Sequence, residues 1–127
     1  MSLVARLRLG VGIILCLLHT APMAEPLPGE ALFAVACEAC HSLESEPDHR
    51  IGPPLGGLNG RKAAAVSGFA YSPALQNSDW RWTLPTLLAW LTDPDAAIPN
   101  NAMNYVNALS AEETQRLAEW LLAQQSD

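Results

Sequence analysis

The feature that most constrains this chain is a Cys-Glu-Ala-Cys-His run at positions 37–41. A Cys-x-x-Cys-His run is typical of c-type haem attachment, in which the two cysteines form thioether bonds with the vinyl groups of one porphyrin. The spacing brings Cys37 and Cys40 to one face of a helix, and His41 then lies under the iron and can bind it through a ring nitrogen. The run therefore predicts one haem c, bonded covalently to Cys37 and Cys40, with His41 as an axial ligand.

Two other interpretations of the cysteine pair have less support. A zinc site needs four ligands, and beyond this run the only other cysteine or histidine after residue 24 is His49. A thioredoxin-like redox pair belongs in a βαβ frame, whereas the pattern of this chain is helical. His49 is expected to form loop hydrogen bonds rather than to bind iron.

The first 24 residues have the pattern of a secretory signal peptide. Arg6 and Arg8 precede an apolar run at positions 9–18 that is too short to span a bilayer comfortably. Cleavage is expected after Ala24, and an uncleaved membrane anchor is the alternative. We therefore divide the chain into a signal peptide, residues 1–24, and one domain, residues 25–127, which is expected in the periplasm.

Removal of the signal peptide makes the chain strongly acidic. All 13 acidic residues lie at or after Glu25, whereas five of the seven basic residues remain, which gives a net charge of −8. Nucleic acid and anionic lipid are therefore poor partners. We expect a monomer without a small-molecule substrate, whose partners are redox proteins with basic or apolar docking faces.

The remaining pattern predicts an all-α fold. Apolar residues recur at helical spacing, and no stretch alternates convincingly like a strand. Thr83, Asp93 and Ser110 are expected to cap three of the helices. Positions 42–59 and 99–107 are rich in proline, glycine or asparagine and are expected to be loops. Helices are expected at residues 29–39, 84–91, 94–98 and 111–124.

The second axial position of the iron needs a ligand as well. Met103 is the only methionine after the signal peptide, and it lies in a loop rather than on an apolar helix stripe. This setting weakens the alternative that it fills the core. Ligation by His41 and Met103 would saturate the iron and favour electron transfer over oxygen chemistry. The Pro53 carbonyl could accept the His41 ring N–H, and Arg61 could pair with a haem propionate.

Taken in register, these residues resemble the class I c-type cytochromes, which include mitochondrial cytochrome c and its bacterial relatives. The resemblance extends from Gly29 to Leu121 with no apparent insertion or deletion. It implies a small domain in which the first and last helices cross beside one covalent haem. It rests on the Cys-x-x-Cys-His run, on Gly29, Phe33, Trp82, Leu91, Leu117, Trp120 and Leu121, and on the segments 52–55, 60–62, 68–71, 93–94 and 98–103.

The same resemblance implies roles for individual residues. His41 and Met103 would be the axial ligands, and Pro53 would accept the hydrogen bond from His41. Arg61, Tyr71 and Trp82 would lie around the propionates, and Trp90 would lie near the methionine sulfur.

The chain also departs from the family pattern. Trp90 stands where the family usually has tyrosine, Leu75 where it has asparagine, and Asn100 and Asn101 where it has glycine and threonine before the methionine. The lysines that surround the haem edge in the family are missing, because Lys62 is the only lysine.

The leading functional prediction is a periplasmic one-electron carrier, not an enzyme. Its alternative is a haem subunit of a periplasmic oxidoreductase, which would use the same chemistry with a permanent partner. A haem peroxidase or ligand sensor is less favoured, because it needs an open iron and a distal acid–base residue.

Overall fold

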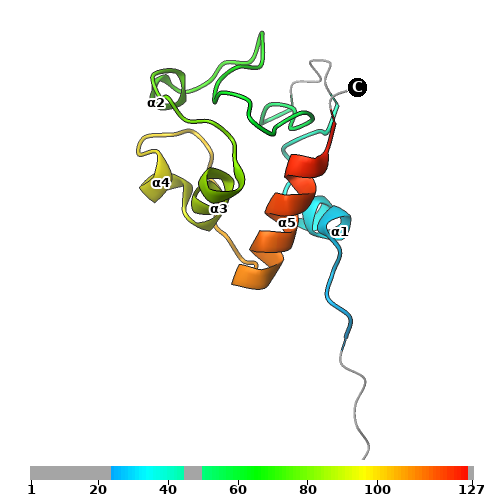
Figure 1. The fold of residues 1–127 in the computed structure, drawn as a ribbon. Coiled ribbons are helices and arrows are strands. Elements are labelled where there is room, and N and C mark those ends of the chain that lie inside the picture. Colours follow the sequence, from blue (N-terminus) through cyan, green and yellow to red (C-terminus); the bar gives the residue numbers. More distant parts are fainter. Residues whose placement is uncertain (1–23, 45–49, 126–127) are drawn as a thin grey trace, which may run out of the picture.

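The computed structural model describes residues 24–44 and 50–125, and this part of the chain is all-α (Figure 1). Among these residues the only β-type pairing is a single bridge between Lys62 and Arg81. His49 and residues 1–23 of the predicted signal peptide lie outside the described residues. The helices are α1 (Gly29–Ala36), α2 (Pro73–Gln76), α3 (Leu84–Thr92), α4 (Pro94–Ala97) and α5 (Ala111–Ala123).

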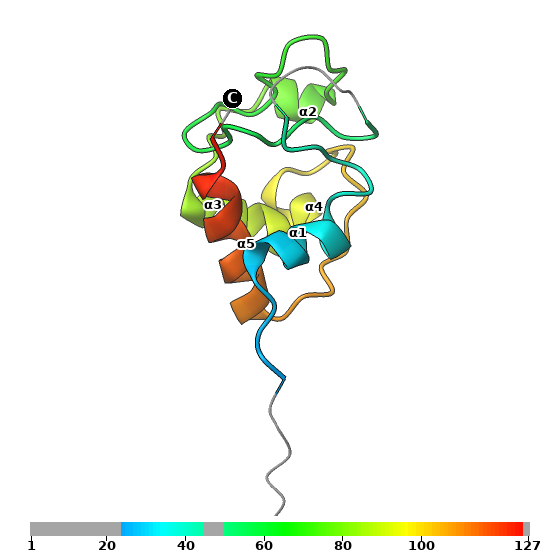
Figure 2. The same ribbon diagram turned by 90° about the vertical axis from the view of Figure 1, so that its right-hand side faces the viewer.

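Helices α1 and α5, at opposite ends of the sequence, pack directly against each other (Figures 1 and 2). Gly29 makes this close crossing possible, because a Cβ atom added there would overlap the side chain of Trp120. Phe33 is 5% exposed, and its ring centroid lies 5.6 Å from that of Trp120. Leu32 and Leu117 are completely buried in the same region. The predicted crossing of the first and last helices is therefore confirmed.

The predicted caps begin the helices that form the rest of the core. The Thr83 backbone N–H donates to Thr86 Oγ1 (2.8 Å) at α3, and Asp93 Oδ1 accepts from the Ala96 N–H (3.0 Å) at α4. At α5, Ser110 and Glu113 form a reciprocal capping box. Helix α3 packs against both α4 and α5, so the three segments are joined into one core.

The backbone of the Cys-x-x-Cys-His run is a turn, whereas the prediction was a helix. Helix α1 ends at Ala36 rather than at position 39, and residues 37–40 form a turn. The backbone N–H groups of Cys37 and Glu38 both donate to the Phe33 carbonyl (2.8 and 3.1 Å), and this shared acceptor ends the regular helical ladder. The prediction that the two thiols share a helical face is wrong, because they lie on this turn.

Helix α2 was not predicted, although its local signal is present in the sequence. Ser72 Oγ accepts from the Leu75 N–H (3.3 Å), and Pro73 occupies the first turn. This is the same combination of cap and proline that begins α4. Leu75 is buried, so one short turn of helix places an apolar side chain in the core. Within residues 24–44 and 50–125, no helix has the length and apolar character needed to cross a membrane.

Candidate functional site

The core contains a cavity of about 400 Å³, which lies within the usual size range of cofactor pockets. Its wall draws on loops and helices from across the domain, and most of the lining side chains are apolar. The wall includes every residue that the sequence predicted for the site: Cys37, Cys40, His41, Pro53, Arg61, Tyr71, Trp82, Trp90 and Met103. The structure thus brings these residues together, whereas their roles as ligands stay predictions.

His41 is buried and held in one orientation. Its Nδ1 atom donates to the Pro53 carbonyl at 2.7 Å, the contact proposed from the sequence. A carbonyl only accepts, so Nδ1 carries the proton and Nε2 keeps its lone pair. Burial lowers the pKa of His41, and the bond to Pro53 opposes that shift. A neutral imidazole with a free Nε2 is the form that binds a metal ion.

Gly52 has a role at this site that the sequence motif alone did not assign. It is buried, and its N–H donates to the Cys40 carbonyl (2.8 Å). A Cβ atom at this position would overlap the His41 imidazole ring. Glycine is therefore required for the backbone to pass directly beside the ring while Pro53 accepts its N–H.

The two cysteines border the same cavity as free thiols. Burial raises the pKa of Cys37 to about 11, and nearby Cys40 adds to the rise. Both shifts favour the protonated thiol over the thiolate. Among the residues described, no group of three or more His, Cys, Asp or Glu side chains could hold a metal ion.

Arg61 lies on the cavity wall, half-buried and hydrogen-bonded to the backbone. Its two terminal nitrogens donate to the Gly56 carbonyl (2.7 Å) and the Pro54 carbonyl (3.0 Å). Burial lowers the pKa of Arg61 and Tyr71 opposes this shift, but a guanidinium stays protonated. Burial raises the pKa of Tyr71. A fixed cation with unused N–H groups and a protonated phenol suit an anionic group such as a propionate.

The segment that carries Arg61 is held in place by neighbouring backbone. The Trp82 N–H donates to the Arg61 carbonyl (3.0 Å), and the Trp82 ring lies edge-to-face with Trp90 at 5.5 Å.

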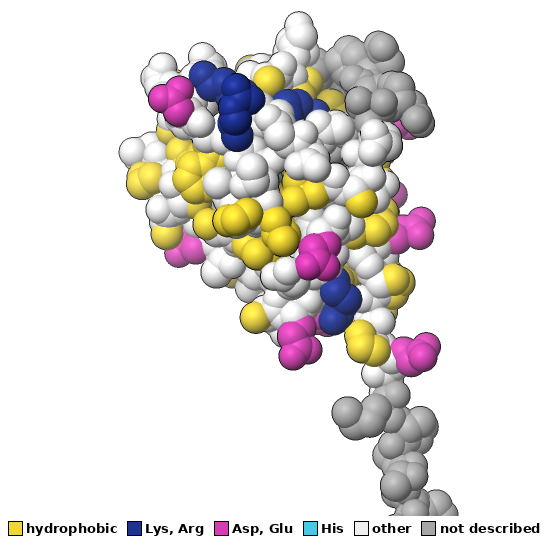
Figure 3. Space-filling view, viewed as in Figure 1, with side chains coloured by type: hydrophobic (Ala, Val, Ile, Leu, Met, Phe, Trp, Pro, Cys, Tyr) yellow, Lys and Arg dark blue, Asp and Glu magenta, His cyan; other side chains and the backbone are white. Residues whose placement is uncertain are grey.

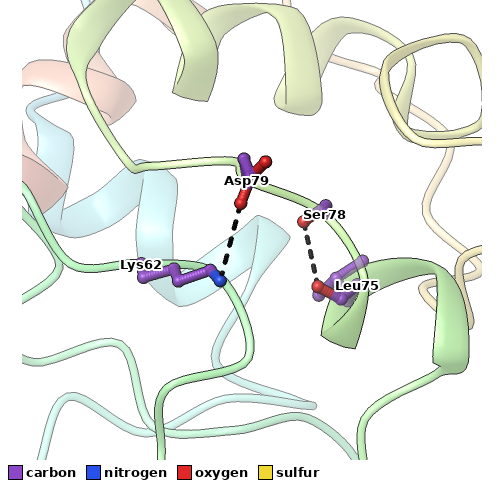
Figure 4. Close-up of polar contacts among 4 residues, drawn as sticks. All are labelled: Lys62, Leu75, Ser78 and Asp79. Atoms are coloured by element: carbon purple, nitrogen blue, oxygen red, sulfur yellow. Dashed lines mark hydrogen bonds and ion pairs between the residues drawn. The ribbon is translucent and has the colours of Figure 1, made fainter.

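Next to Arg61, the Lys62 ammonium lies 3.7 Å from an Asp79 carboxylate oxygen, and Ser78 Oγ donates to the Leu75 carbonyl (Figure 4). The Lys62 side chain is 47% exposed and that of Asp79 is fully exposed, so this ion pair contributes little to stability.

Met103 reaches the cavity from the loop between α4 and α5. Its backbone N–H donates to Asn101 Oδ1 (2.8 Å), and its carbonyl accepts from the Tyr105 N–H (2.9 Å). Tyr105 also lines the cavity, and burial raises its pKa. Sequence reasoning missed Tyr105, because a tyrosine in a polar loop has no periodic pattern that marks it as facing a site.

The residues present fit a covalently attached haem. Two thiols, an imidazole with a free nitrogen and a thioether border one cavity that is otherwise mainly apolar. A porphyrin needs such apolar walls on both faces, and its iron accepts imidazole and thioether ligands.

Comparison with known proteins gives a consistent result. The Cytochrome c family model matches residues 27–125. Cytochrome c of Chlamydomonas reinhardtii is 36% identical over 101 residues, which cover 80% of this chain and 90% of that protein. Cytochrome c2 iso-2 of Magnetospirillum molischianum is 38% identical over 85 residues, covering 67% of this chain and 87% of its own length.

A solved structure agrees with the sequence comparisons. Cytochrome cH from Methylobacterium extorquens superposes with a TM-score of 0.66 at 33% identity, covering 73% of this chain and 92% of that one. Because both sequence and fold match over most of the described domain, this chain belongs to the cytochrome c family, whose members carry electrons on a haem.

Proposed function

We propose that this protein is a periplasmic one-electron carrier with a single haem c, bonded to Cys37 and Cys40 and ligated by His41 and Met103. The observation that carries the proposal is that Met103, 62 positions after His41, borders the same cavity as His41 and both thiols. Bound haem supplies a one-electron couple at its iron, while the protein supplies binding, orientation and electrostatics.

The chain's own groups would fix the haem rather than react. Pro53 orients the His41 ring through a 2.7 Å hydrogen bond. Arg61, Tyr71 and Trp82 would surround the propionates, and buried Trp90 would pack near the methionine sulfur. The apolar walls exclude water, which reduces the rearrangement that accompanies a change of iron charge. These features favour a carrier over a peroxidase or sensor, which would need an open iron.

Covalent attachment is tested by extraction. Acid–acetone treatment of the holoprotein should leave the haem on the polypeptide, because thioether bonds survive conditions that break axial ligation. The Cys37→Ser/Cys40→Ser double variant is the matched control, and any haem it binds should pass into the organic phase. Release of haem from the wild-type protein into that phase would contradict the attachment.

Axial ligation by Met103 is tested by spectroscopy. Met103→Ala should abolish the weak far-red absorption band of the ferric Fe–S bond and let the ferrous protein bind carbon monoxide. Val106→Ala, in the same loop but 89% exposed, should leave the spectrum unchanged. Ready binding of carbon monoxide by the wild-type protein at neutral pH would favour the ligand-binding alternative.

Export to the periplasm is supported by the signal-peptide pattern and by the bacterial relatives. Cell fractionation followed by mass spectrometry should find the mature protein in the periplasm, beginning at Glu25. Size-exclusion chromatography of the native periplasmic species separates a free carrier from a subunit of a larger complex. A mass near that of the monomer would favour the carrier.

We also propose that the partner docks through a basic or apolar face. The cavity-lining residues that are exposed to solvent are Ile51, Lys62, Ala70, Ala102 and Asn104. Lys62 is the only charged one, and Asp79 lies within ion-pairing distance of it. On the face in Figure 3, hydrophobic side chains occupy much of the middle, acidic groups lie at the rim and within the lower half, and Lys and Arg side chains lie near the top and at the lower right. An acidic partner would find no ring of lysines here.

A further inference from the structure

The loop that precedes Met103 is tied together by one side-chain amide, that of Asn101. Asn101 Oδ1 accepts from the Met103 backbone N–H at 2.8 Å. Asn101 Nδ2 donates to Asp95 Oδ1 at 3.0 Å and to the Ile98 carbonyl at 3.0 Å. A single planar group thus connects the backbone of Met103 to α4 and to the residue that follows α4.

The anchor at the other end of this connection is rigid. Ile98 is 7% exposed and belongs to the apolar core. Between Ile98 and Asn101 the chain reverses, with Asn100 in the left-handed region at φ 64°. Asparagine tolerates this conformation better than most residues. The turn therefore directs the Asn101 side chain back toward α4 and forward to Met103 at the same time.

Both polar backbone groups of Met103 are used within the loop. Its carbonyl accepts from a backbone group, the Tyr105 N–H, whereas its N–H donates to the Asn101 side chain. Of these two bonds, only the second can be removed by changing a side chain. It is also the one that links Met103 to the core through Ile98, so a single substitution can loosen Met103 and leave its own side chain intact.

We propose that Asn101 is a positioning residue for the sixth ligand: it holds the Met103 loop closed and so sets how easily an external ligand displaces the thioether. This inference rests on the proposed ligation by Met103. An external ligand can bind the iron only when Met103 moves away, and opening of the loop would break the bond between the Met103 N–H and Asn101 Oδ1. Each such bond is worth a fewfold change in the opening equilibrium.

Asn101 is suited to this role because it needs a donor and an acceptor at once. Aspartate would keep the acceptor for the Met103 N–H but lose the donor, and its carboxylate would face that of Asp95. The amide of Asn101 and the carboxylate of Asp95 can therefore be exchanged between the two positions. In Asp95→Asn/Asn101→Asp the donor lies on residue 95 and the acceptor on residue 101, which restores the bond between the side chains.

The test is titration of the ferric holoprotein with imidazole, followed by loss of the far-red Fe–S band. Asn101→Ala should tighten the apparent imidazole Kd about fivefold or more, as the loss of one or more hydrogen bonds predicts. Asn101→Asp should also tighten it, and the exchanged double variant should move back toward the wild-type value. Asn77→Ala, at an exposed position with ordinary backbone angles outside the cavity wall, should leave it unchanged.

The outcomes separate this inference from the proposed function. If Met103→Ala binds imidazole no more tightly than wild type, Met103 is not a ligand and the proposed function fails. If Met103→Ala binds more tightly but Asn101→Ala matches wild type, only the role of Asn101 is overturned. Failure of the double variant to recover would overturn the anchor at Asp95. Should Asn101→Ala fold poorly, Asn101→Asp takes its place, and an imidazole Kd equal to the wild-type value in that variant overturns the role of Asn101.

Discussion

At the scale of single residues, the space beside His41 is the tightest constraint on the site. Gly52→Ala would push a Cβ atom into the imidazole ring, so either the ring or the loop must shift. We expect a loss of about 1–3 kcal/mol in the free energy of unfolding, as is usual for overpacked positions, together with a smaller haem-loaded fraction. Denaturant unfolding of the ferric protein and the ratio of haem to protein measure the two effects.

Pro53→Ala is the control for that variant. It keeps the carbonyl that accepts the His41 Nδ1–H, so it should retain the haem more fully than Gly52→Ala. Equal losses in the two variants would mean that the loop as a whole is sensitive, and that the close approach of Gly52 is not the cause.

At the scale of secondary-structure elements, the α1–α5 crossing depends on Gly29. In an isolated helix, replacing glycine by alanine is favourable by about 1 kcal/mol. Here the new methyl group would meet Trp120, and overpacking costs about 1–3 kcal/mol. Gly29→Ala should therefore be destabilising in chemical unfolding, whereas Val35→Ala on the exposed side of α1 should change stability by about 0.5 kcal/mol or less. A stabilised Gly29→Ala variant would contradict this packing.

The capping box of α5 should give a measurable dependence on pH. Hydrogen bonds from Ser110 hold the pKa of Glu113 below its ordinary value of 4.5. A lowered pKa in the folded state means that the carboxylate stabilises the protein above the unfolded pKa, and that this contribution is lost as pH falls through the folded pKa. Glu113→Gln should thus be destabilised at pH 7, and the difference from wild type should shrink below pH 4.5.

Glu112→Gln is the matched control for the capping box. It removes the same charge from the same turn, but its side chain takes no part in the reciprocal bonds of Ser110 and Glu113. Thermal unfolding at several pH values should show a smaller effect for this variant. Identical pH profiles would assign the stabilisation to the helix dipole rather than to the cap.

At the scale of the whole molecule, net charge should govern the encounter with the partner. After signal-peptide removal the chain carries −8, so acidic partners are repelled at long range. With a basic partner, added salt should slow electron transfer, most steeply below about 0.1 M, where the Debye length exceeds about 10 Å. With an apolar docking face, the rate should depend little on salt. Stopped-flow kinetics with the native partner measures this, and a rate that rises strongly with salt would contradict the proposed docking.

Local sequence by itself determines the haem-attachment run and the positions where three of the helices begin. The spacing of the cysteines and His41 indicates a haem site, and the caps at Thr83, Asp93 and Ser110 mark where three helices begin. These signals are readable because each interaction joins residues within one turn of the chain. The nine predicted site residues line one cavity. Haem extraction tests the attachment to the two cysteines, and the spectrum of Met103→Ala tests the axial ligation.

Only the tertiary structure decided the features that depend on contacts between distant segments. The need for Gly29 follows from the approach of Trp120 in α5, and the need for Gly52 follows from the passage of a later loop beside His41. The bond between the Trp82 N–H and the Arg61 carbonyl likewise joins two segments that are far apart in the sequence. Periodicity and capping report on neighbours within a turn, whereas these contacts exist only after the core has brought the loops together.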